Sequence, residues 1–101
     1  MWTYKITGGI NMVESKFKPG QLLRHFKRDF ISEEERKQNK YLYQVIGIAI
    51  HSETKEPMLI YQGLYAPFEM YARPLAMAEE KTDKVKYPEA RQEYRLQIWE
   101  G

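Results

Sequence analysis

The chain contains no cysteine among its 101 residues. Disulfide bonds, thiolate metal sites and a cysteine nucleophile are therefore excluded. No apolar run approaches the ~20 residues that a membrane-spanning helix needs, and the longest, Val45 to Ile50, has only the length of a strand. The N-terminal sequence also lacks the apolar core and small-residue cleavage site of a signal peptide. These absences predict a cytoplasmic protein.

Charge of one sign is also scarce, because the formal net charge is only +2. That value is too small to indicate a nucleic-acid-binding protein by itself. A hydrophobic content of 43% with 30% charged residues is ordinary for a globular protein. The length suits one domain. We expect that domain to span residues 18–100, and residues 1–17 to form an N-terminal extension that is either an additional strand or flexible.

Two apolar segments joined by a polar turn form the centre of the chain. Tyr41 to Ile50 is rich in aromatic and branched residues and is apolar on both faces, which predicts a strand buried on both sides. Met58 to Tyr65 alternates and predicts its antiparallel partner. Gly47 and Ala49 indicate either close approach of another segment or a bend at the glycine.

The remaining pattern predicts three further short strands, at Gln21 to Phe26, Glu69 to Arg73 and Glu93 to Glu100. Ser32 and Glu35 have the spacing of a capping box, so a surface helix is expected from about Glu33 to Gln38. A helical turn or two is expected after Leu75. Five short strands with no long helix predict a mainly β protein, specifically a small five-stranded barrel with short helical insertions.

Several separate motifs carry a family resemblance. In chain order they are Pro19-Gly20, Arg24-His25-Phe26-Lys27, Tyr43-Gln44-Val45, His51-Ser52-Glu53-Thr54, Tyr61, Leu64-Tyr65, Arg73-Pro74-Leu75 and Tyr87-Pro88. From about Lys18 to Leu96 the chain resembles the small bacterial family catalogued as domain of unknown function 1653. The resemblance implies an SH3-like barrel and no established activity. The chain departs from the family pattern in a longer charged insertion between Lys27 and Lys40, and in Tyr71, where a tryptophan is usual.

The turn His51 to Thr54 is one candidate site. A histidine and a carboxylate two residues apart, His51 and Glu53, could supply an acid and a base. The alternative is structural: Ser52 and Thr54 cap turn amides while Glu53 pairs with a lysine. His25, His51 and Glu53 could in principle bind a transition metal, but the spacing is not diagnostic, and we expect neither a metal nor another cofactor.

Arginine and tyrosine form the second candidate site. Arg24 and Arg73 have the planar guanidinium that holds a phosphate or carboxylate in two contacts. They could form an anion pocket if their strands approach each other, or internal ion pairs with Glu53 or Glu69. Tyrosines such as Tyr61 and Tyr65 could stack bases or grip a peptide, or could simply fill the core.

These patterns favour a non-catalytic module that binds an anionic ligand such as a nucleotide or nucleic acid. The expected ligand-binding residues are Arg24, His25, His51, Ser52, Glu53, Tyr61, Tyr65 and Arg73. One alternative is a small hydrolase-like enzyme that uses His51 and Glu53. Another is an adaptor that binds a protein partner through a contiguous apolar patch.

Overall fold

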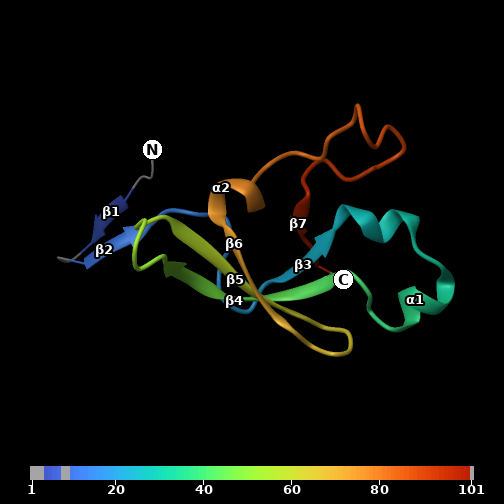
Figure 1. Cartoon of the computed structure of the whole chain (residues 1–101), viewed down its shortest axis with the longest axis horizontal. Coiled ribbons are helices and arrows are strands. Elements are labelled where there is room, and N and C mark those ends of the chain that lie inside the picture. The colour runs from blue at the N-terminus through green and yellow to red at the C-terminus, as the bar shows by residue number, and fades with distance from the viewer. Residues whose placement is uncertain (1–3, 8–9, 101) are drawn as a thin grey trace.

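The computed structural model describes residues 4–7 and 10–100, and within them the fold is mainly β (Figure 1). Five strands form one antiparallel sheet in the order β6-β5-β4-β3-β7, and two more form a separate hairpin. The elements are β1 (Tyr4–Thr7), β2 (Ile10–Val13), β3 (Leu22–His25), the 3-10 helix η1 (Phe26–Phe30), α1 (Glu33–Lys37), β4 (Leu42–Ile50), β5 (Pro57–Gly63), β6 (Met70–Pro74), α2 (Leu75–Ala78) and β7 (Leu96–Ile98).

The mainly β class and the five predicted strands of the sheet are confirmed. The central hairpin β4–β5 forms as predicted. In β5 the structure buries the set Leu59, Tyr61 and Gly63. Helix α1 begins at the predicted capping box: the Ser32 side chain accepts from the Glu35 amide, and the Glu35 carboxylate accepts from the Ser32 amide. Trp2, Gly8 and Gly9 lie outside the described residues, and the segments beside them, β1 and β2, pair from Tyr4↔Val13 to Thr7↔Ile10.

The expected barrel does not close. The edge strands β6 and β7 each pair with one neighbour only, so the sheet remains open within the described part of the chain. It is nevertheless curved around a single core, because Leu75, directly after β6, and Leu96, in β7, share one buried cluster although they come from opposite edges. The other buried members of that cluster are Phe17, Leu23, Tyr43, Val45, Leu59, Tyr61 and Ala78.

The exposure of strand β4 differs from the prediction that this strand is buried on both faces. Ile46 and Ile50 are 43% and 44% exposed, so the strand is not buried on both faces along its length. The cause is a β-bulge: Val45 pairs with Tyr61 and Gly47 with Ile60, which leaves Ile46 unpaired. An extra residue reverses the alternation beyond it and bends the strand. The sequence indicated a bend at Gly47. It gave no reason to expect the change of face. Among the described residues, no atom lies within 4 Å of the place that a Cβ at position 47 would occupy, so close approach does not explain the glycine.

Candidate functional site

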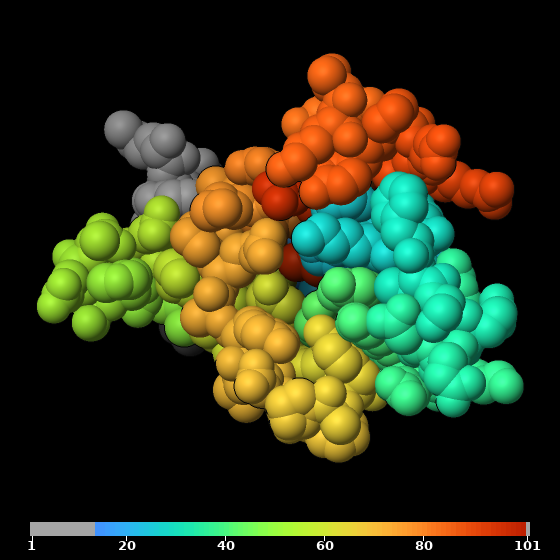
Figure 2. All heavy atoms as spheres, turned by 45° about the vertical axis from the view of Figure 1, so that its right-hand side comes forward, coloured from blue at the N-terminus to red at the C-terminus, as the bar shows by residue number. Residues whose placement is uncertain are grey.

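A cleft of about 410 Å³ opens where three distant parts of the chain meet. They are the end of β3 with the start of η1, the end of β6, and the segment of residues 80–95. Figure 2 shows that last segment, in orange, lying against the cyan segment that contains η1. The lining residues are His25, Phe26, Lys27, Arg73, Glu80, Lys81, Asp83, Lys86, Tyr87 and Arg95.

Residues 80–95 form a loop whose two ends are tied together. Lys81 and Tyr94 form an isolated antiparallel bridge, and the Thr82 amide donates to the Glu93 carbonyl at 2.8 Å. The Phe26 amide donates to the Arg95 carbonyl at 3.0 Å, which joins the base of the loop to β3. The loop therefore returns to the sheet beside η1 and supplies one wall of the cleft.

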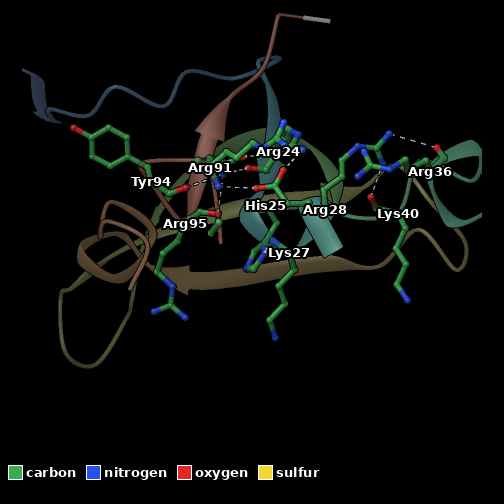
Figure 3. A network of polar contacts seen from close by, with 12 residues as sticks. Arg24, His25, Lys27, Arg28, Arg36, Lys40, Arg91, Tyr94 and Arg95 are labelled. Atoms are coloured by element: carbon green, nitrogen blue, oxygen red, sulfur yellow. Dashed lines mark hydrogen bonds and ion pairs between the residues drawn. The ribbon is translucent and has the colours of Figure 1, made fainter. Parts of the chain in front are cut away.

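A buried polar network holds the loop of residues 80–95 against β3 (Figure 3). The Gln92 side chain is only 6% exposed, and its amide group donates to the carbonyls of Arg24, Tyr94 and Arg95. The Arg24 guanidinium donates to Gln92 Oε1 and to Asp29 Oδ1, both at 2.7 Å. Arg24 thus forms an internal ion pair, although its partner is neither Glu53 nor Glu69, the two partners considered from sequence.

Asp29 joins a further segment to the network. Its second carboxylate oxygen accepts from the Arg91 amide at 3.1 Å. Burial raises the pKa of this carboxyl, but hydrogen bonds from Arg24 and Arg91 outweigh that effect, and the pKa lies below its ordinary value. Asp29 is therefore ionised at neutral pH and compensates the charge of Arg24.

The cleft itself is strongly basic. Five of its lining residues are lysines or arginines and two are carboxylates. Arg95 pairs with Glu80 at 3.4 Å, and Lys81 pairs with Glu93 at 3.6 Å. Lys27, Arg73 and Lys86 form no ion pair within the part of the chain that the structure describes. The carboxylate of Asp83, whose Oδ1 accepts from the amides of Val85 and Lys86, lines the same cleft. Three cations without an ion pair therefore face one such carboxylate, and the cleft keeps an excess of positive charge.

His25 lines the same cleft as these cations. Its Nδ1 caps η1 by accepting from the Lys27 amide at 3.1 Å, and its ring stacks on Phe26 with centroids 4.7 Å apart. Burial lowers the pKa of His25 to about 4, and the positive charges of Arg73 and Lys27 act in the same direction. The ring is therefore neutral at pH 7. Because Nδ1 accepts a hydrogen bond, the proton is on Nε2, which is left as a donor.

The predicted His51 to Thr54 site is a separate turn at the end of β4. His51 Nδ1 accepts from the amides of Glu53 at 3.2 Å and Thr54 at 3.3 Å, and Thr54 Oγ1 accepts from the Glu56 amide. The Thr54 hydroxyl thus caps a turn amide, as in the structural alternative, and the His51 imidazole caps two more. Ser52 and Glu53 are exposed in the same turn. The described residues contain no group of three His, Asp or Glu side chains arranged to hold a metal ion.

The predicted tyrosines gather in a cluster that extends from the core. Tyr61 is buried and packs edge-on against Tyr43 with centroids 5.1 Å apart. The hydroxyl groups of Tyr43 and Tyr65 lie 3.0 Å apart and share a hydrogen bond. Burial raises the pKa of Tyr43, and burial together with the charge of Tyr65 raises the pKa of Tyr71 to about 12. Tyr43 and Tyr71 are therefore neutral aromatic groups at physiological pH.

The structure brings together only two of the predicted ligand-binding residues, His25 and Arg73, in the cleft. Arg24 supports its wall, while His51, Ser52, Glu53, Tyr61 and Tyr65 lie elsewhere. Sequence reasoning missed Lys27, Lys86 and Arg95 as site residues. The Tyr87-Pro88 motif, next to Lys86, was the one signal that pointed to the loop.

Comparison with known proteins gives one match. The model of a family described as protein of unknown function (DUF1653) matches residues 21–96, about three quarters of the chain. No curated protein and no solved structure matches. Every segment that lines the cleft lies within the matched residues. Among the described residues, no helix is long and apolar enough to cross a membrane.

Proposed function

Since the chain belongs to the DUF1653 family, whose description assigns no function, we propose from its own cleft that it is a non-catalytic module that binds a phosphate-bearing ligand. The observation that carries this proposal is the group of cations Lys27, Arg73 and Lys86, which outnumber the carboxylate of Asp83 around the neutral ring of His25. We propose the cytoplasm as its compartment, which the lack of cysteine supports.

Electrostatics favours an anion over a neutral ligand. Like charges held together in a partly enclosed site repel one another, and a bound anion removes that repulsion. The guanidinium of Arg73 offers two parallel donors, which match two oxygens of a phosphate, while each lysine contributes a point charge. His25 Nε2 adds a neutral donor. This set of donors suits a group with several acceptor oxygens and more than one negative charge.

Two features favour binding rather than turnover. Of the two carboxylates in the cleft that could act as a base, Glu80 is paired with Arg95 at 3.4 Å, and Asp83 Oδ1 accepts from the amides of Val85 and Lys86. The one free nitrogen of His25 belongs to a ring with a pKa of about 4, far from the range in which a general base works best at neutral pH. The other histidine, His51, holds its own turn through Nδ1.

Titration of the protein with inorganic pyrophosphate, followed by amide NMR, tests the proposal. We expect saturable shifts at His25, Lys27, Arg73 and Arg95. Arg73→Gln should weaken binding about tenfold, since a charge-assisted contact is worth ~1.5 kcal/mol. The matched control is Lys18→Gln, which removes one exposed positive charge that does not line the cleft. Equal weakening in both variants would show a general charge effect and would refute a site in the cleft.

A further inference from the structure

A second hollow lies beside the cleft. It has a volume of about 460 Å³ and is lined by Asp29, Phe30, Arg36, Glu89 and Arg91. Two of its residues are arginines, of which Arg36 has an exposed partner in Glu33, with Nε and Oε1 3.9 Å apart. Asp29 is already engaged by Arg24 at 2.7 Å, so Glu89 is the carboxylate whose charge opposes an anion there.

Two aromatic rings connect the hollow with the cleft. Tyr87 lines the cleft and Phe30 lines the hollow, and their ring centroids are 6.3 Å apart. Tyr87 is held in place by Phe26, with centroids 4.8 Å apart, whereas Phe30 is 50% exposed. Along this surface, the basic cleft is therefore followed by the aromatic pair Tyr87 and Phe30, and then by the second hollow with its two arginines. The exposed face of Phe30 lies between two groups of cations and is accessible to a ligand.

This alternation fits one class of polymer. Proteins that bind single strands combine cations along the phosphates with aromatic rings on which bases stack. A duplex fits poorly, because its bases are already stacked and because an element that reads its major groove must enter it. The described helices have four or five residues each, too few to do so.

We infer that the phosphate-bearing ligand is a single-stranded nucleic acid that runs from the cleft past Phe30 into the second hollow. Phosphates lie against Lys27, Arg73 and Lys86 in the cleft and against Arg36 and Arg91 beyond it. One base stacks on the open face of Phe30. This inference rests on the proposed function, because it assigns the cleft to one end of the strand.

The test is fluorescence anisotropy with labelled oligothymidylate and oligouridylate of two, four and eight nucleotides. We expect affinity to rise at least tenfold from the shortest to the longest, because only the longer chains reach both hollows. If each of the five cations neutralises one phosphate, raising the salt from about 50 to about 200 mM should weaken octanucleotide binding roughly a hundredfold. Both sugars support the inference, and the ratio of their affinities identifies the source of the strand.

Single substitutions measure what the exposed ring and the second hollow each contribute to binding. Phe30→Ala should weaken the octanucleotide about tenfold, within the range for loss of a stacked base. It should leave pyrophosphate binding unchanged. Phe68→Ala is the matched control, since Phe68 is 57% exposed but lines neither hollow, and should have no effect. Glu89→Gln should strengthen octanucleotide binding a fewfold, because it removes the opposing charge.

The outcomes distinguish this inference from the proposed function. Affinity that does not depend on length, with pyrophosphate still bound in the cleft, would overturn the strand and leave the phosphate site intact. Equal binding of a blunt duplex, or equal effects of Phe30→Ala and Phe68→Ala, would overturn it as well. If neither pyrophosphate nor any oligonucleotide bound, both proposals would fail together.

Discussion

Acidification should destabilise this protein through His25. The folded ring has a pKa of about 4, whereas an unfolded histidine titrates near 6.5. Above pH 6.5 both states are neutral and the group has no effect. Between pH 6.5 and 4 the unfolded state binds a proton that the folded state does not, so the free energy of unfolding decreases as the pH falls. Below pH 4 the folded ring is also protonated, and the loss stops growing.

The size of this loss follows from the same difference in pKa. Each pKa unit corresponds to about 1.4 kcal/mol, which sets an upper limit of roughly 3 kcal/mol. Partial contact of the ring with solvent screens the neighbouring charges and reduces the expected loss to about 2 kcal/mol. For a domain of this size that loss corresponds to a fall in Tm of roughly 10 °C.

Urea denaturation at several pH values between about 7.5 and 4 measures the effect. The comparison is with His25→Gln, which cannot titrate but keeps a polar side chain at the N-cap. We expect the difference in unfolding free energy between the two proteins to change by about 2 kcal/mol over that range. Parallel pH profiles for the two proteins would refute the partly buried position of His25 beside Arg73 and Lys27.

Three further predictions concern the supports of the fold. Gln92→Leu should cost about 3 kcal/mol in urea denaturation, because it removes the hydrogen bonds of Gln92 to three carbonyls and to the Arg24 guanidinium, which keeps only its bond to Asp29; a loss below about 0.5 kcal/mol would contradict the network. Ser32→Ala should lower stability by about 1 kcal/mol, and an unchanged Tm would argue against the cap. Tyr65→Phe should cost about 1 kcal/mol and bring the pKa of Tyr43, followed by absorbance, closer to its ordinary value.

Local features of the fold could be predicted from sequence because their causes are local. Ser32 and Glu35 are three residues apart, and the capping box needs nothing else. The pairing of β4 with β5 could be predicted because a short polar turn joins two neighbouring apolar segments. The bulge at Ile46 could not be predicted, because it depends on how two strands align beyond the turn that joins them. Closure of the barrel likewise depends on edges that meet only in three dimensions.

The candidate site was predicted in part for the same reason. His25 and Arg73 stand in recognisable motifs, and both line the cleft. Lys86 and Arg95 do not stand out in the sequence, since they reach the cleft only because the Lys81↔Tyr94 bridge and Gln92 return their loop to β3. Conversely, His51 and Glu53 form an attractive pair in sequence, but the imidazole is used to hold the turn.

The pKa of His25, measured by NMR with and without saturating pyrophosphate, tests the phosphate site most directly. The positive charges of Arg73, Lys27 and Arg95 help to lower this pKa, and an anion bound among them would compensate those charges. We predict that pyrophosphate raises the pKa from about 4 towards 6.5, and that Lys18→Gln shows the same increase while Arg73→Gln shows less. A pKa that stays near 4 at saturating pyrophosphate would contradict binding in the cleft.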